Sequence, residues 1–160
     1  MPSEELERAV RRLADKDAIS DLVRCYSHCV DRKLYDELAA LFVEDCVIDF
    51  GPGVGPAVHG RTAFRATLGK PGGGFAATSH HNANVLITFE NEDWASVRSS
   101  VYAWHLRHDG DTALIWGCYD DIVARTPQGW RFAARKLRVA GHENYDLDWL
   151  PLIDNARRTG

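Results

Sequence analysis

The chain has 160 residues, of which 45% are hydrophobic and 26% are charged. These values fit one globular domain and exclude a disordered chain. The formal net charge of −4 argues against binding to nucleic acid or to a membrane surface, because both partners usually require a basic face. We therefore expect a single domain over 1–160 with neither kind of partner.

The first third of the chain carries helical patterns. Ser3 begins a short polar helix, and Asp15 with Asp17 is a start signal for a second helix. Apolar residues three and four positions apart continue this second helix up to Val30, and it should end near Asp31. Another helix follows, with these residues on its inner side: Leu34, Leu38, Leu41 and Phe42.

The pattern changes to strands in the second half of the chain. A short strand at 47–50, a Gly/Pro loop at 51–56 and a short helix at 59–68 come first. Four segments rich in β-branched and aromatic residues follow: 79–90, 95–107, 112–125 and 129–140. The turns between them are short, and such turns join antiparallel neighbours. This order predicts an α+β fold, with N-terminal helices packed in a curved antiparallel sheet that encloses a pocket.

The four cysteines, Cys25, Cys29, Cys46 and Cys118, lie in apolar-periodic segments and lack CxxC spacing. We expect them to be buried free thiols in a reducing compartment. The N-terminus lacks the layout of a signal peptide, and no apolar run approaches the roughly 20 residues of a membrane span. We therefore predict a cytoplasmic location.

The first candidate for chemistry is Tyr26 with Asp31, at the end of the long predicted helix. Unpaired carbonyls at a helix C-terminus disfavour a carboxylate there by up to roughly 1 kcal/mol, so Asp31 should seek a cationic partner. The alternative interpretation is a turn aspartate neutralised by its neighbours Arg32 and Lys33.

The second candidate is the pair of histidines that opens the first long strand. Strand side chains alternate, so only one of His80 and His81 can face the pocket, although both could lie at the surface. His80 shares its face with Asn82 and Asn84, whereas the face of His81 is apolar. A substrate pocket favours the mixed face, and this favours His80.

Other residues could bind a substrate or a metal. The further substrate-binding candidates are His81, Trp104, Tyr119, Asp121 and Arg135. His105 and His108 have poor metal-ligand spacing and no third ligand nearby, so we predict no metal site. Because no glycine-rich phosphate loop, nucleophile elbow or dinucleotide fingerprint is present, we also predict no cofactor.

Six short segments of the chain together resemble a known family. They lie at 18–26 with Asp31, 41–45, 60–61, 78–85, 117–121 and 129–131. Over about residues 10–140, this pattern is similar to SnoaL-like domains of the nuclear-transport-factor-2-like superfamily. Within the superfamily the chain is most similar to the branch that contains scytalone dehydratase, bile-acid 7α-dehydratase and hexachlorocyclohexane dehydrochlorinase.

The resemblance implies a role for each matching residue. In that branch an aspartate orients a histidine, which removes a proton as the leaving group departs. Asp31 falls at the aspartate position and His80 at the histidine position. Tyr26 lies where relatives place a tyrosine or lysine beside the leaving group. Arg135 resembles an arginine that some members use on the substrate or the leaving group.

We therefore expect a cofactor-independent lyase of the dehydratase type, acting on a small, mostly apolar, cyclic substrate. One alternative is proton transfer in the same pocket, as in an isomerase or a polyketide cyclase. Another is a non-catalytic ligand-binding module like the β subunit of aromatic-ring dioxygenases. Tryptophans 94, 104 and 116 indicate an interface, so we expect a homodimer or homotrimer. Residues 141–160 should form a lid over the pocket or an arm at that interface.

Overall fold

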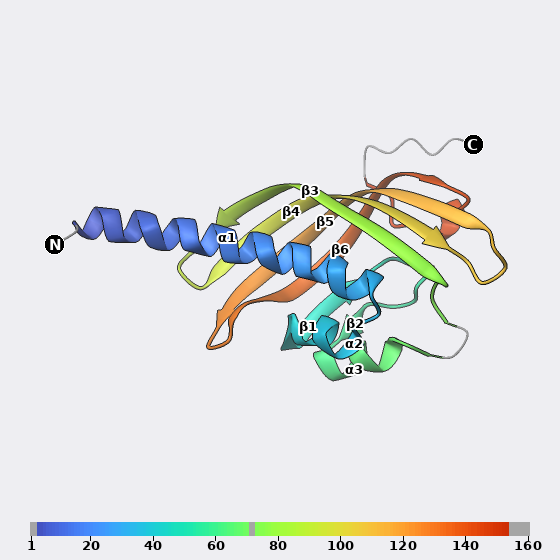
Figure 1. Cartoon of the computed structure of the whole chain (residues 1–160), viewed down its shortest axis with the longest axis horizontal. Coiled ribbons are helices and arrows are strands. Elements are labelled where there is room, and N and C mark those ends of the chain that lie inside the picture. Colours follow the sequence, from blue (N-terminus) through green and yellow to red (C-terminus); the bar gives the residue numbers. More distant parts are fainter. Residues whose placement is uncertain (1–2, 71–72, 154–160) are drawn as a thin grey trace.

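One long helix and a strongly curved sheet make up most of the molecule (Figure 1). The computed structural model describes residues 3–70 and 73–153. Its elements, in chain order, are α1 (Glu4–Asp31), α2 (Tyr35–Ala40), β1 (Phe42–Asp49), β2 (Val58–His59), α3 (Arg61–Thr67), β3 (Ala77–Phe89), β4 (Trp94–Leu106), β5 (Thr112–Thr126), β6 (Gly129–Glu143) and the 3₁₀ turn η1 (Leu147–Trp149).

Helix α1 is continuous, so the prediction of two separate N-terminal helices was wrong. Ser3 caps it by accepting a hydrogen bond from the Leu6 N–H, and the predicted end at Asp31 is confirmed. No glycine or proline interrupts the segment. Asp15 does not cap a helix; its carboxylate accepts hydrogen bonds from Trp130 Nε1 at 3.0 Å and Arg125 Nη2 at 2.8 Å.

The predicted four-stranded antiparallel arrangement of β3, β4, β5 and β6 is confirmed. The predicted short strand at 47–50 is the end of the longer β1, whose length and place in the sheet the sequence did not reveal. The strand order of the sheet is β2-β1-β6-β5-β4-β3, and β1 runs parallel to β6. Phe42, expected at the end of a helix, instead begins β1. The Phe132 N–H donates to the Leu41 carbonyl at 2.9 Å at the start of this pairing.

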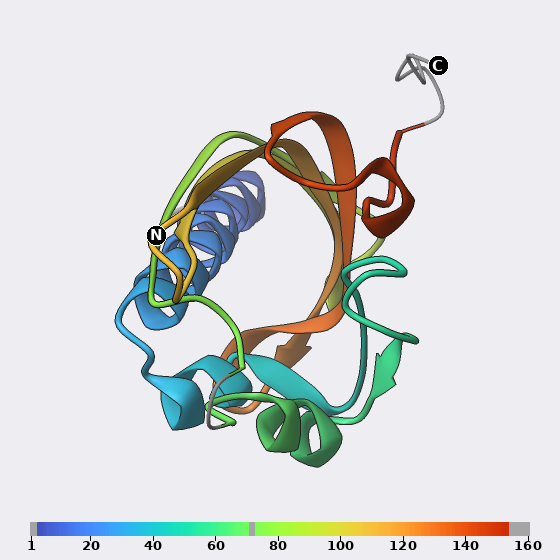
Figure 2. The same cartoon turned by 90° about the vertical axis from the view of Figure 1, so that its right-hand side faces the viewer.

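The sheet wraps around α1, and α2 and α3 lie across one end (Figure 2). The core between these layers is rich in aromatic rings. Phe42 and Phe132 are wholly buried, with ring centroids 5.1 Å apart, and the Tyr26 ring meets both edge-on. Burial of each phenylalanine stabilises the fold by roughly 1.5–3 kcal/mol. The C-terminal end of α1 is thereby fixed against β1 and β6.

A β-bulge in β3 exchanges the inner and outer faces of this strand. Leu86 lies three positions after Ala83, whereas their partners on β4, Ser100 and Arg98, are only two positions apart. Asn84, at the bulge, has a φ of 51°. Before the bulge the even-numbered residues face the helix, and after it the odd-numbered ones do. Leu86 is accordingly 67% exposed, although its odd-numbered neighbours pack on the core.

The chain after β6 turns back along the mouth of the curved sheet. We call residues 144–152 the C-terminal strap. Leu152 forms a parallel bridge with Val139, and the Gly53 N–H donates to the Trp149 carbonyl at 3.1 Å. The strap therefore lies beside the loop that follows β1, as Figure 2 also shows. The rest of the predicted C-terminal arm, 154–160, lies outside the described residues.

The cysteines depart in part from the sequence-based prediction. Cys29 and Cys46 are buried, but Cys25 is exposed and Cys118 is half-buried, because each of these two lies on the outer side of its element. All four thiols are free. Within 3–70 and 73–153, no helix combines the length and apolar character needed to cross a membrane.

Candidate active site

A cavity of about 210 Å³ lies between the end of α1, the inner face of the sheet and the C-terminal strap. Its walls are mostly aromatic and aliphatic, and none of the described residues that line it, within 3–70 and 73–153, carries a permanent charge. The polar groups at its surface belong to Tyr26, Tyr35, Thr78, His80, His105, Tyr119, Tyr145 and Trp149. The cavity therefore suits a small neutral molecule bound through a few directional hydrogen bonds.

Asp31 and His80 are in contact at the wall of this cavity. The distance between Asp31 Oδ1 and His80 Nδ1 is 2.6 Å, and the His80 backbone N–H donates to Asp31 Oδ2 at 2.8 Å. The Thr78 hydroxyl donates to Asp31 Oδ1 at 2.8 Å. The bulge after Asn82 keeps this first part of β3 turned toward α1, so the contact joins the helix end to the strand. Asp31 lies behind His80 and does not itself line the cavity.

These hydrogen bonds fix the charge state of the aspartate and the tautomer of the histidine. Burial alone would raise the pKa of Asp31, but the hydrogen bonds from His80 and Thr78 outweigh burial and lower it. The carboxylate then requires a proton on His80 Nδ1. In the neutral imidazole Nε2 is therefore an acceptor, and it makes no hydrogen bond to the described residues.

A second histidine at the cavity was not recognised as a site residue from the sequence. His105 on β4 is buried, and its ring centroid lies 5.4 Å from that of His80. Its Nδ1 is 2.9 Å from the hydroxyl of Tyr145 in the strap. Burial, together with the nearby His80, lowers the pKa of His105 to about 4, so its imidazole is neutral at physiological pH. The sequence signal that could have identified His105 is its position two residues after Ala103, because strand residues two apart lie on the same face of the sheet.

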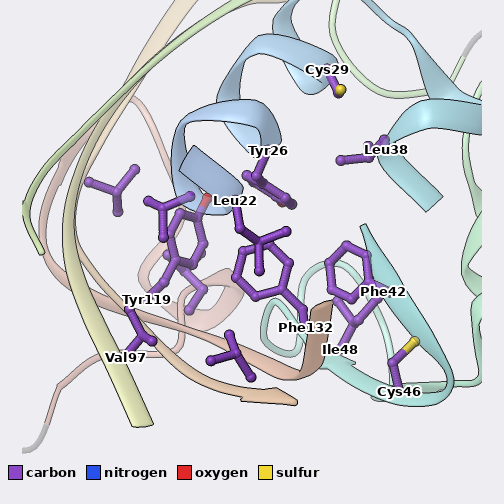
Figure 3. Packing of buried hydrophobic residues seen from close by; sticks show 14 of the residues in the cluster. Leu22, Tyr26, Cys29, Leu38, Phe42, Cys46, Ile48, Val97, Tyr119 and Phe132 are labelled. Carbon is purple, nitrogen blue, oxygen red and sulfur yellow. The ribbon is translucent and has the colours of Figure 1, made fainter. Parts of the chain in front are cut away.

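Two tyrosines form the inner end of the cavity. Tyr26 on α1 and Tyr119 on β5 have ring centroids 5.7 Å apart. Figure 3 shows Tyr26 pointing from the end of α1 into the core, with Phe132 nearby. Burial raises the pKa of both hydroxyls, so each remains a hydrogen-bond donor at neutral pH. Both residues line the cavity, while the catalytic role of Tyr26 and the binding role of Tyr119 stay predictions.

Arg135 and Asp121 were predicted to bind substrate, but neither lines the cavity. They form a fully buried pair, with Arg135 Nε and Nη2 2.9 and 2.7 Å from the two oxygens of Asp121. The guanidinium lies 3.8 Å from the Tyr26 ring centroid and 4.2 Å from that of Tyr119. The two tyrosines therefore separate it from the cavity. The nearby carboxylate raises the pKa of Arg135, although burial opposes this change.

Two other substrate-binding candidates lie outside the cavity. His81 is exposed on the outer face of β3, where Ser79 Oγ is 3.2 Å from its Nε2. Trp104 lies on the opposite face of β4 from His105, because neighbouring strand residues alternate.

Within 3–70 and 73–153, no cluster of three or more His, Cys, Asp or Glu side chains could hold a metal ion. Trp94 and Trp116 are exposed on the outer face; the oligomeric state remains a prediction.

The site thus combines a proton acceptor with proton donors in an apolar enclosure. His80 Nε2 can accept a proton, and the carboxylate of Asp31 would stabilise the resulting imidazolium. The hydroxyls of Tyr26 and Tyr119 can donate to an oxygen atom of a bound molecule. This arrangement suits removal of a proton from a carbon atom of a bound molecule.

Sequence comparisons give a family match over most of the chain. Residues 11–136 match the family model described as the SnoaL-like domain. An uncharacterised protein of Mycobacterium tuberculosis strain H37Rv is 29% identical over 131 residues, which cover 79% of this chain and 86% of that protein.

Solved structures give a matching result. A crystal structure from Novosphingobium aromaticivorans, provisionally named as a scytalone dehydratase, is 35% identical, with a TM-score of 0.82. The match covers 93% of this chain and 99% of that chain. The hexachlorocyclohexane dehydrochlorinase of Novosphingobium barchaimii is 20% identical, with a TM-score of 0.73, and covers 84% of this chain and 92% of its own. At that identity the likeness concerns the fold alone.

Proposed function

The chain belongs to the SnoaL-like domain family, and on that premise we propose that it is a cofactor-independent lyase that removes water from a small, neutral, cyclic molecule. The observation that carries this proposal is the Asp31–His80 contact at the wall of an apolar cavity. The structural likeness to the N. aromaticivorans protein provisionally named as a scytalone dehydratase supports it.

In the proposed reaction His80 Nε2 removes a proton from a carbon next to a carbonyl group. The electron pair of the broken C–H bond forms a carbon–carbon double bond, and the C–O bond on the neighbouring carbon breaks. The departing hydroxide takes a proton from the Tyr26 hydroxyl and leaves as water. The proton on His80 then returns to Tyr26 through solvent. A positioned base of this kind accelerates a reaction by about 10²–10⁴-fold.

The properties of the cavity narrow the substrate class. Its volume of about 210 Å³ limits the substrate to a small ring system. In the part of the chain that the structure describes, no charged side chain lines the cavity, and this disfavours a carboxylate or a phosphate group on the substrate, because neither would find a counter-ion there. We therefore propose monocyclic or bicyclic β-hydroxy ketones as the class to test.

The test is incubation of the purified protein with a panel of such ketones, followed by mass spectrometry and ultraviolet absorbance of the products. We expect a product lighter by one water molecule and carrying a conjugated carbon–carbon double bond. An isomerisation or a cyclisation by the same base would leave the mass unchanged, and that result would replace the elimination with proton transfer.

His80→Ala should reduce the turnover by about 10²–10⁴-fold. His81→Ala is the matched control, because the next side chain on the strand is exposed on the opposite face and should retain full activity. A fully active His80→Ala variant would contradict the proposed mechanism.

A further inference from the structure

The C-terminal strap contributes two aromatic side chains to the cavity wall. Tyr145 and Trp149 both line the cavity, and their rings are stacked with centroids 4.9 Å apart. Arg107 binds the backbone carbonyl of Asn144, and its guanidinium lies 5.5 Å from the Tyr145 ring centroid. The strap is therefore held on both sides of the tyrosine that reaches His105.

The position of Tyr145 determines which nitrogen of His105 carries the proton. Its hydroxyl lies 2.9 Å from His105 Nδ1, and the neutral imidazole has only one N–H. If His105 donated through Nδ1, the phenol proton would have no acceptor among the described residues. The favoured arrangement is therefore donation from the Tyr145 hydroxyl to His105 Nδ1, which leaves the proton of His105 on Nε2.

We propose that Tyr145 is a positioning residue: the strap sets His105 as a hydrogen-bond donor through Nε2, opposite the acceptor Nε2 of His80. The cavity then presents one acceptor and one donor on two neighbouring imidazoles, whose ring centroids are 5.4 Å apart. The donor would bind the carbonyl oxygen or the leaving oxygen of a substrate. The catalytic part of this inference rests on the proposed lyase function, whereas the part that concerns the tautomer of His105 does not.

Seating of the strap depends on two glycines in the facing loop. A Cβ built on Gly53 would lie 1.8 Å from Trp149 Cδ1, and one on Gly51 would lie 2.6 Å from Pro151 Cδ. The indole of Trp149 thus rests directly on the backbone of Gly53, and the ring of Tyr145 stacks on the same indole. A side chain at residue 53 would displace Trp149 and, through the stack, the hydroxyl of Tyr145.

Nitrogen-15 NMR of the histidine side chains tests the tautomer directly at neutral pH. In the parent protein His105 should show a protonated Nε2 and an unprotonated Nδ1. Tyr145→Phe keeps the ring but removes the hydroxyl, so the proton should move to Nδ1 or be shared between both nitrogens. Tyr102→Phe removes an exposed hydroxyl on the outer face of β4 and should leave the His105 signals unchanged.

Gly53→Ala tests whether the strap transmits the effect. It should change the His105 signals in the same direction, because Trp149 and Tyr145 move together. With an active substrate, Tyr145→Phe should lower kcat by about tenfold, the effect of one hydrogen bond, with less change in KM.

A proton on Nδ1 of His105 in the parent, or an unchanged tautomer in Tyr145→Phe, would overturn the inference. An unchanged tautomer in Gly53→Ala would remove the role of the strap. If no ketone is turned over, the lyase proposal fails, while the NMR result still decides the tautomer.

Discussion

Asp31 and Asp121 each hold a nitrogen-bearing side chain, but in different surroundings. The partner of Asp31 is His80, whose second ring nitrogen remains available at the cavity wall. The partner of Asp121 is Arg135, which is wholly buried behind two tyrosines. A histidine can gain and lose a proton during a reaction, whereas arginine remains charged throughout.

The difference shows that a charged pair beside a cavity need not belong to the reacting set. Only the Asp31 pair combines a titratable partner with access to the enclosed space. The Asp121 pair instead places a fixed positive charge under the rings of Tyr26 and Tyr119. The pair therefore contributes to stability and holds those rings in place, because the face of an aromatic ring attracts a cation.

The largest effect that distinguishes the two pairs should be on stability. Arg135→Met leaves the carboxylate of Asp121 buried without a partner and should lower the free energy of unfolding by about 3–5 kcal/mol. Chemical denaturation measures this loss. Arg98→Met breaks the exposed pair with Asp120 and should leave the denaturation midpoint nearly unchanged. Equal stability of Arg135→Met and the parent would contradict a structural role for the buried pair.

The Asp31 pair should be more sensitive in activity than in stability. Asp31→Asn removes the charge that orients and stabilises His80, so turnover of a β-hydroxy ketone should fall by about 10²–10³-fold. The loss of stability should be smaller, about 1–2 kcal/mol, because the amide oxygen can still accept hydrogen bonds. Asp21→Asn, at an exposed position of the same helix, is the control. Retention of full turnover by Asp31→Asn would place the base elsewhere.

The third effect concerns the dependence of stability on pH through His105, and it is smaller than the effect of Arg135→Met. Burial and the neighbouring His80 lower the pKa of folded His105 to about 4 from the ordinary 6.5, so below pH 6.5 the unfolded chain binds more protons. Stability should therefore fall as the pH drops from 6.5 toward 4, by up to about 3 kcal/mol. His105→Gln should flatten this dependence in thermal melts, whereas His108→Gln, at an exposed turn, should preserve it. An unchanged slope in His105→Gln would refute this assignment.

Local patterns predicted most of the fold. The end of α1 at Asp31 and the four long strands follow from side-chain spacing and turn residues, which act over a few positions. The parallel pairing of β1 with β6 joins segments about ninety residues apart, and no local pattern encodes it. The continuity of α1 was missed because Asp15 resembles a cap, although its carboxylate binds Arg125 and Trp130.

The candidate site was predicted only in part. The contact of Asp31 with His80 was anticipated from the helix end and the family resemblance. The face argument for His80 reached the right residue for a wrong reason, since it assumed regular alternation through Asn84. In a strand without the bulge, His81 would lie on the same face as the apolar residues Val85 and Ile87, and that face packs on the core. Contacts made by Tyr145 and Arg135 depend on chain segments brought together only in the folded protein.

The extra residue in β3 also bears on which changes the strand can accept. A substitution at one position alters one side chain, but a deletion or insertion between His80 and the bulge would reassign every side chain on one side of it. Which residues of β3 face the cavity and which face the core therefore depends on the number of residues in the strand as well as on their identity. Across homologous chains, this stretch should tolerate replacements far better than gaps.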